Sequence, residues 1–222
     1  ERLRKTMVAD VAHELRTPLT NLRGYLEALN DGVIPPSSET LQMLQQENLR
    51  LVHLVGNLQQ LARADAAKAY LKRESLLLSD LVSHLLALGQ LNFQKKEIAV
   101  ETDYDALERP VRADKDKVLQ AMQNLLDNAC KYTPQGGRVR VAVTPIAEGM
   151  KVTIQNTGPE IPAADLPYIF ERFFRADRSR SRLGGGAGIG LAISRELIEA
   201  HGGAVGAECA AGKTSIWLML PF

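Results

Sequence analysis

The chain has 222 residues, of which 45% are hydrophobic and 24% are charged, as in a globular protein that buries a core in one or two domains. Its 27 basic and 26 acidic residues nearly cancel, so neither nucleic acid nor a membrane surface is an expected partner. The two cysteines lie far apart without zinc-ligand spacing, which favours a reducing compartment, and no apolar run is long enough to cross a membrane. We therefore expect a cytoplasmic location.

Two long helices are predicted at the start of the chain. From Val8 to Leu29, apolar residues recur at alternating steps of three and four, the spacing of an amphipathic helix. Residues 30–37 contain a glycine and two prolines that end this pattern, and Ser37 is the expected N-cap of a second helix, whose stripe begins at Leu41. One hairpin cannot bury both stripes, so we expect two copies to form a dimeric four-helix bundle.

The rest of the chain mixes shorter elements, which is typical of an α+β sandwich. A long irregular stretch between Asn156 and Ala187 is unusual, because loops of this length in compact domains are mostly functional lids or disordered segments. We expect two domains, a helical hairpin at 1–66 and an α+β domain at 67–222. The predicted helices cover about 79–95, 114–132 and 188–201, and the predicted strands cover 98–102, 138–146, 151–156, 203–209 and 214–220.

The string His-Glu-Leu-Arg-Thr-Pro interrupts the first predicted helix. At about 100° per residue, His13 points away from the apolar stripe, so burial in the core is disfavoured. Thr17 lies on the same face one turn later, and Glu14 can approach the imidazole from the side. Pro18 removes a backbone donor, which predicts a kink in the turn that carries His13. A largely neutral imidazole beside a carboxylate is a candidate nucleophile, and a solvated surface histidine is the alternative.

This string resembles the phospho-acceptor box of the sensor histidine kinases of two-component systems. The resemblance implies that His13 is phosphorylated, that Glu14 is the general base for its attack on ATP, and that Thr17 orients water when the protein dephosphorylates its partner. It also implies a homodimer, the receiver domain of a response regulator as partner, and a second domain of the ATP-binding type shared with gyrase and Hsp90. The chain would then be the cytosolic portion of an inner-membrane sensor.

The segment QNLLDNACKYT at 123–133 places polar side chains on one face of a predicted helix. Asn124, Asn128 and Lys131 are spaced by four and three residues, and Tyr132 follows. Such residues are often ordinary polar positions near a helix end, but two amides and an ammonium can also hold a hydrated Mg²⁺ and phosphate oxygens. The segment resembles the asparagine box of the family, which implies that these four residues bind Mg²⁺-ATP, with Asn124 and Asn128 on the metal.

The segment QNTGPEIP at 155–162 resembles the first glycine box of the family, whose usual form is Asp-x-Gly-x-Gly. The resemblance implies that Asn156 replaces the aspartate that accepts a hydrogen bond from the adenine amino group, with Gly158 and Ile161 also at the nucleotide. Asn156 offers an acceptor without a charge, and Glu160 replaces the second glycine. We therefore expect nucleotide binding to be weaker or differently poised.

The segment FERFFRADRSRSR at 170–182 contains five arginines, and a nucleic-acid patch is one interpretation. Its position between two glycine-rich segments fits phosphate contact better. It resembles the phenylalanine box of the family, in which the phenylalanines anchor a mobile lid, and Arg175 is the expected contact to the transferred phosphate.

The segment GGGAGIGLAI at 184–193 spaces three glycines at alternate positions and runs into a predicted helix. Bare backbone at a helix N-terminus favours an anion, although a flexible linker is the alternative. The segment resembles the second glycine box of the family, which implies ATP contacts from Gly186, Gly188, Gly190 and Leu191. The later GKT is no P-loop, because it lacks the preceding glycine, and Thr214 instead resembles the threonine near the nucleotide base.

The sequence therefore predicts a protein histidine kinase that phosphorylates its own histidine and passes the group to an aspartate of a response regulator. One alternative is a docking module in which the changes at Asn156 and Glu160 abolish useful ATP binding. A serine kinase or ATPase with the same nucleotide fold is a second alternative, disfavoured because it does not need the pattern at 8–22. The other histidines, His53, His84 and His201, are expected to be structural.

Overall fold

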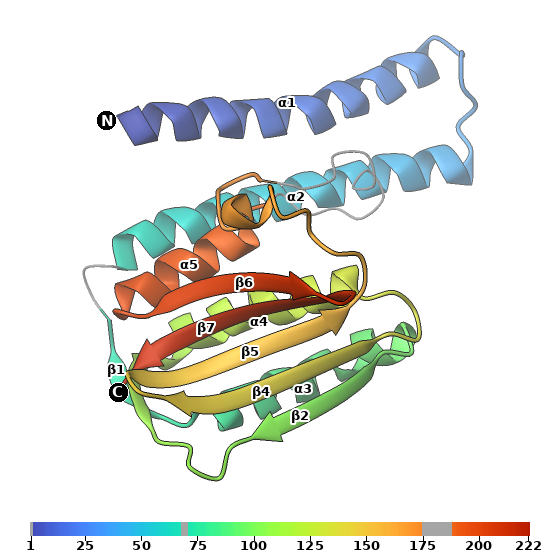
Figure 1. Cartoon of the computed structure of the whole chain (residues 1–222). Helices are drawn as coiled ribbons and strands as arrows, with labels where there is room; N and C mark the ends of the chain where they lie inside the picture. The colour runs from blue at the N-terminus through green and yellow to red at the C-terminus, as the bar shows by residue number, and fades with distance from the viewer. Residues whose placement is uncertain (1, 68–70, 175–187) are drawn as a thin grey trace. The chain divides into compact units, whose positions relative to one another are not determined.

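The computed structural model describes residues 2–67, 71–174 and 188–222, with side chains of the first two helices described for 15–49, 51–52 and 54–56. The chain divides into two compact units, one containing the residues up to Gln60 and the other the described residues from Leu61 onward. Figure 1 shows two long helices in the N-terminal part and a sheet with its own helices in the C-terminal part. None of the described helices combines the length and hydropathy needed to cross a membrane.

Helices α1 (Arg2–Asn30) and α2 (Ser38–Ala67) confirm the two long helices expected from the apolar periodicity. Ser37 is the N-cap of α2, as predicted, because its Oγ accepts a hydrogen bond from Thr40 N at 3.2 Å. Pro18 lies inside α1, and the kink expected there stays a prediction.

The apolar stripes of this hairpin are only partly covered. Leu19 and Leu26 of α1 are 53% and 55% exposed, and Leu41 of α2 is 59% exposed. A hydrogen bond from Asn21 Nδ2 to Glu47 Oε1 at 3.3 Å joins the two helices. Amphipathic helices normally bury such a stripe against another element, so the hairpin by itself leaves apolar surface that a further partner could cover.

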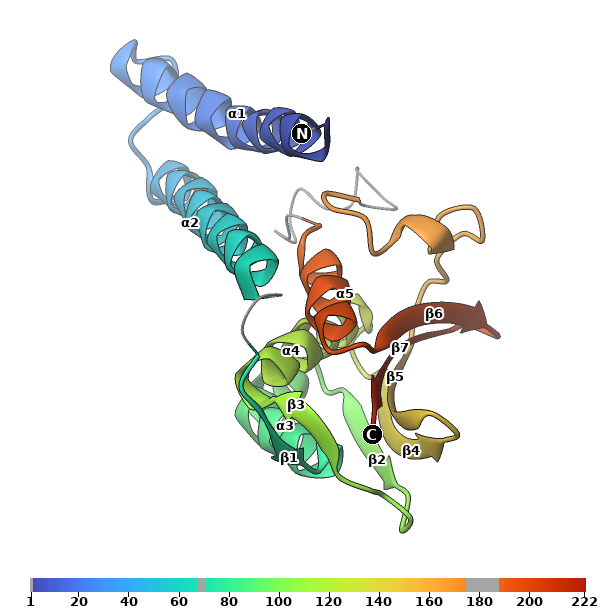
Figure 2. The same cartoon turned by 90° about the vertical axis from the view of Figure 1, so that its left-hand side faces the viewer.

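The second unit is built on a five-stranded sheet in the order β2-β4-β5-β7-β6. β2 and β4 are parallel, and the other neighbouring pairs are antiparallel. Helices α3 (Leu78–Lys95), α4 (Lys115–Tyr132) and α5 (Gly190–Ala200) lie on one side of this sheet (Figure 2), which confirms the expected α+β sandwich. The strands are β2 (Ala99–Tyr104), β4 (Arg138–Ile146), β5 (Gly149–Thr157), β6 (Ala204–Ala210) and β7 (Lys213–Pro221).

Three short elements were not predicted from the sequence. β1 (Arg73–Leu76) pairs antiparallel with β3 (Val111–Asp114), and a single 3₁₀ turn, η1, covers Leu166–Tyr168. The two strands have four residues each and carry charged side chains, so neither shows the alternation of a longer strand.

The core of the second unit lies between the sheet and its helices. In β4, Val139, Val141 and Val143 are fully buried, whereas Arg138 and Arg140 are exposed, the two-residue period of a strand with one buried face. Removing one such aliphatic side chain from water contributes about 1.5–3 kcal/mol. This alternation sets which residues of each strand face the helices.

The other face of the sheet carries the only tryptophan of the chain. Trp217 of β7 lies over Gly206 of β6, and a Cβ on this glycine would lie 2.3 Å from the indole ring. Lys151 Nζ lies 4.5 Å from the ring centroid. A side chain at position 206 would therefore collide with the indole ring where it now lies.

His201 joins the end of α5 to the start of α4. Its side chain is buried; Nε2 accepts a hydrogen bond from Asp114 N at 3.0 Å, and Nδ1 donates to Leu197 O at 2.7 Å. These two contacts suit the neutral imidazole with its proton on Nδ1. Burial lowers the pKa of His201 below its usual range, and the hydrogen bond to Leu197 opposes this effect.

We predict that His201 makes the stability of this unit depend on pH. Because its folded-state pKa is lowered, the unfolded chain binds more protons, so the free energy of unfolding should fall as the pH drops below about 6.5. His201→Gln should lower the free energy of unfolding at about pH 8. In this variant the free energy of unfolding should also change less as the pH falls. Urea unfolding between about pH 8 and pH 5.5 measures how the free energy of unfolding depends on pH. The control is His84→Gln, at an exposed position in α3, which should keep the slope of free energy against pH. An unchanged slope in His201→Gln would contradict the assignment.

Candidate functional site

Helix α4 has one apolar buried face and one polar accessible face. Asp114 caps its N-terminus by accepting a hydrogen bond from Lys117 N at 3.3 Å. Asn124 and Asn128 are half-buried and Lys131 is exposed, so the asparagine-box residues share an accessible side of the helix, as predicted. The buried face consists of Val118, Ala121, Met122, Leu125, Leu126 and Ala129.

Asn124 connects α4 to the first residue of α5. Its Nδ2 donates to Gly190 O at 3.0 Å, and a Cβ on Gly190 would lie 3.6 Å from Asn124 Cγ. Ser194, fully buried one turn later in α5, donates to Ala121 O at 3.0 Å. The structure therefore brings part of the predicted asparagine box against part of the predicted second glycine box.

The two asparagines fit a hydrated Mg²⁺ ion. Since Asn124 uses its amide NH₂ on Gly190, Oδ1 is its atom for a cation, and this oxygen accepts no hydrogen bond within the described part of the chain. Amide oxygens are hard ligands of the type Mg²⁺ accepts, and this ion usually keeps several waters. Among the described residues there is no group of three or more His, Cys, Asp or Glu side chains that could hold a metal ion.

The N-terminus of α5 has no side-chain cap, since its N-cap position is Ile189. Its first backbone N–H groups are donors of the kind that bind anions. Gly188 has φ +68°, and a Cβ there would lie 2.7 Å from Phe174 O, so a larger residue would not fit. Leu191 is half-buried in the first turn.

At the other end of α4, Asn156 and Thr214 lie side by side on β5 and β7, both buried. Asn156 Nδ2 donates to Thr157 O at 3.2 Å, which leaves Oδ1 as the acceptor of this amide. Cys209 Sγ lies 3.3 Å from Thr214 Oγ1. An acceptor and a hydroxyl in a largely apolar layer suit the polar edge of a planar base.

Gly158 packs directly against the last turn of α4. Its φ is +151°, and a Cβ there would lie 2.8 Å from Tyr132 O. Gly158 N donates to Gly212 O at 3.2 Å, and Glu160 Oε1 accepts from Gly212 N at 2.6 Å. Hydrogen bonds therefore join the segment that follows β5 to the β6–β7 turn. This segment includes the half-buried Ile161.

These contacts define a site with two ends along one helix. From Asn124 to Tyr132 a helix rises about 12 Å. One end has an amide oxygen and bare helix N–H groups, and the other has an acceptor and a hydroxyl in an apolar layer. This arrangement suits a ligand with phosphates at one end and a base at the other.

The remaining predicted residues are not part of this arrangement as described. Arg175 and Gly186 lie outside the described residues. His13 and Glu14 lie within α1, but their side chains are also outside what is described, whereas Thr17 is exposed. The outward direction of His13 therefore stays a prediction.

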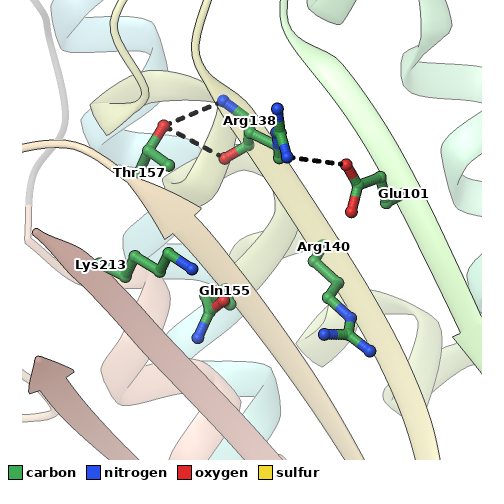
Figure 3. A pocket seen from close by; sticks show the side chains of 6 residues that line it. All are labelled: Glu101, Arg138, Arg140, Gln155, Thr157 and Lys213. Atoms are coloured by element: carbon green, nitrogen blue, oxygen red, sulfur yellow. Dashed lines mark hydrogen bonds and ion pairs between the residues drawn. The ribbon is translucent and has the colours of Figure 1, made fainter. Parts of the chain in front are cut away.

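A cavity of about 200 Å³ lies on the open face of the sheet, away from this site (Figure 3). Arg138 Nη1 lies 3.4 Å from Glu101 Oε1, and Arg138 N donates to Thr157 Oγ1 at 2.9 Å. None of the predicted site residues in the described ranges lines this cavity. Its lining residues are Glu101, Arg138, Arg140, Gln155, Thr157 and Lys213.

Sequence reasoning missed the contacts that attach the phenylalanine segment to α5. Arg172 Nε donates to Glu196 Oε1 at 3.0 Å, and Arg195 Nη1 lies 3.0 Å from Glu171 Oε1. Phe173 N also donates to Gly188 O at 2.9 Å. The paired side chains are 24 residues apart, so no local pattern could have indicated them.

Two family matches cover most of the chain. Residues 3–67 match the His Kinase A (phospho-acceptor) domain, and residues 113–222 match the histidine kinase-, DNA gyrase B- and HSP90-like ATPase family. The solved mycobacterial sensor histidine kinase MprB is 31% identical, with a TM-score of 0.57, over 67% of this chain and 97% of that chain. The chain belongs to the sensor histidine kinases.

A further sequence relative agrees with that assignment, and a further solved structure shares the fold. Sensor histidine kinase WalK of Bacillus subtilis is 37% identical over 229 residues, which cover 99% of this chain but only 37% of the relative. The solved histidine kinase ThkA, in complex with the response regulator protein TrrA, has a similar fold, with 23% identity and a TM-score of 0.82 over 97% of this chain and 61% of that chain. The kinase core thus spans a little over a third of the WalK relative.

We predict that Gly158→Ala disturbs the kinase core at the end of α4. The new Cβ would meet Tyr132 O at 2.8 Å on a backbone that disfavours side chains, so the free energy of unfolding should fall by about 3 kcal/mol. The matched control is Gly136→Ala, where φ is +71° but no atom lies within 4 Å of the new Cβ, and the loss should be about 1 kcal/mol. Equal losses in urea unfolding would show that the close approach to Tyr132 is unimportant.

Proposed function

We propose that this chain uses ATP to phosphorylate His13 and then passes the phosphoryl group to an aspartate of a response regulator. The single observation that supports it most is the hydrogen bond from Asn124 Nδ2 to Gly190 O, which places the amide of α4 beside the uncapped N-terminus of α5. Family membership supports both the phospho-acceptor and the ATPase roles. Residues 1–66 would form the phosphotransfer domain and residues 67–222 the ATP-binding domain.

In the proposed reaction, a nitrogen of His13 attacks the γ-phosphorus of ATP, the bond to the β-phosphate oxygen breaks, and ADP leaves. Glu14 takes the proton of the imidazole. Lys131 and Arg175 neutralise charge on the transferred group, because positioning and electrostatics dominate phosphoryl transfer. Bound through Asn124 and Asn128, Mg²⁺ would supply further positive charge at the phosphates.

We propose that the base is held at the opposite end of α4. Asn156 Oδ1 is oriented as an acceptor, because its NH₂ already bonds to Thr157 O, and this suits the amino group of adenine. Thr214 pairs with Asn156 across β5 and β7, and Gly158 allows a close backbone approach to Tyr132. The amide thus offers a neutral version of the acceptor that an aspartate would supply with a charge.

We propose that the helical hairpin works as a homodimer. Its stripes remain more than half exposed at Leu19, Leu26 and Leu41. Burying one such side chain contributes about 1.5–3 kcal/mol, and pairing two hairpins would bury several of them together. A four-helix bundle would leave the opposite face of α1 accessible for His13 and Thr17.

We propose that the receiver domain of a response regulator is the partner. The likeness in fold to ThkA, which was solved with such a regulator, supports this assignment. The match to a little over a third of the sensor kinase WalK and the two free cysteines support a cytoplasmic location, as the inner part of a membrane-bound sensor.

Purified chain incubated with labelled ATP and Mg²⁺ tests the proposal. A phosphoramidate on histidine is lost in acid, whereas a phosphate ester on a hydroxyl is kept, so we expect acid-labile label that His13→Gln abolishes. Label that survives acid would support a serine kinase, and no label together with no ATP binding would support the docking module. His84→Gln, at an exposed histidine of the second unit, is the control that should keep full labelling.

We predict that Thr17→Ala separates two activities. The exposed hydroxyl of Thr17 is proposed to orient water for hydrolysis of the phosphorylated regulator, not to assist attack on ATP. Thr17→Ala should therefore keep the rate of self-phosphorylation and lower the phosphatase rate at least about tenfold. Both rates are measured with the same protein and a phosphorylated receiver domain, and an equal loss of both would refute the role of Thr17.

A further inference from the structure

Lys96, the C-cap residue of α3, makes three hydrogen bonds to the end of α4. It follows the last residue of α3, and its Nζ donates to Cys130 O at 2.7 Å, Lys131 O at 3.0 Å and Thr133 O at 2.8 Å. An ammonium has three protons to donate, so all three are used here. These bonds satisfy carbonyls that a helix leaves unpaired at its C-terminus, where a positive charge is also favourable.

The backbone of Lys96 holds the loop that follows the same helix. Gly136 N donates to Lys96 O at 2.9 Å, so this residue touches the helix end through its side chain and the following loop through its main chain. The carbonyl of Ala129 is paired by Thr133, because the N and Oγ1 of Thr133 both donate to Ala129 O. The last turn of α4 is therefore fixed by a cation from outside the helix together with its own C-cap.

The end of α4 carries residues of the proposed nucleotide site. Lys131 and Tyr132 are in the last turn, and Asn128 is one turn earlier. Gly158 has no room for a side chain against Tyr132 O, so a shift of this turn moves the segment that begins at Asn156. Lys96 itself is half-buried and contacts this turn at the backbone carbonyls of the turn.

We propose that Lys96 is a positioning residue for ATP binding, acting through the last turn of α4 and the Gly158 segment. This inference rests on the proposed ATP-dependent function. Nothing in the sequence pattern indicated it, because the three carbonyls lie 34 to 37 residues further along the chain. Loss of the ammonium should loosen the last turn, so that part of the binding free energy is spent on ordering it.

Lys96→Met tests the proposal, because it keeps the aliphatic stem and removes all three donors. We expect the Kd for the Mg²⁺ complex of a non-hydrolysable ATP analogue to rise roughly tenfold in calorimetry of the full chain. The KM for ATP in self-phosphorylation should rise similarly and by more than kcat falls, because the variant loosens a turn that binds ATP whereas His13 and Glu14 belong to the other unit. The matched control is Lys95→Met at the neighbouring exposed lysine, which should bind as the unmutated chain does.

A merely structural role gives a different result. A destabilised but correctly positioned site would bind with lower stoichiometry and an unchanged Kd, and that outcome would overturn the proposal. If Lys96→Met does not fold, Lys96→Gln keeps one donor group without the charge, and we expect an intermediate Kd from it. Absence of binding in the unmutated chain would refute the proposed function and this inference with it, whereas normal binding in both Lys96 variants would refute the inference alone.

Discussion

The packing of α4 against the sheet and against α5 is the constraint on which the second unit depends. Its buried side chains, among them Met122 and Leu125, leave one orientation for the helix, and this orientation puts the half-buried Asn124 and Asn128 on its accessible side. Because residues three and four apart share a helical face, the same periodicity that buries one side of α4 groups the polar residues on the other. The core thus decides the geometry of the site before any ligand contact is made.

Both ends of α4 are held by polar contacts from elements distant in sequence. At the start, Asp114 caps the helix and its backbone N–H donates to His201, the C-cap residue of α5. At the end, Lys96 binds carbonyls of the last turn. A helix that is packed in the middle and held at both ends has little freedom to slide or rotate, which suits a scaffold for ligand contacts.

The sequence predicted the long elements and the polar face of α4 because these follow from periodicity and local motifs. It did not predict the pair of short strands β1 and β3, where four residues give too little alternation. It also gave no sign of the Arg172–Glu196 pair or of the Lys96 contacts, since each joins residues far apart in the chain. The sequence shows Asn156 and Glu160 as departures from the usual form of the first glycine box. Their hydrogen bonds to Thr157 and Gly212 could not be predicted, because they depend on how the loops meet.

The lone indole of the chain has a practical consequence. Trp217 lies on β7, in register with Thr153 of β5, and its ring is held between Gly206 and the ammonium of Lys151. Tryptophan fluorescence, excited at a wavelength that tyrosine does not absorb, therefore reports on the sheet-containing unit alone, while far-ultraviolet circular dichroism also records the helical hairpin. Comparing the two signals during unfolding separates the halves of the protein without any label.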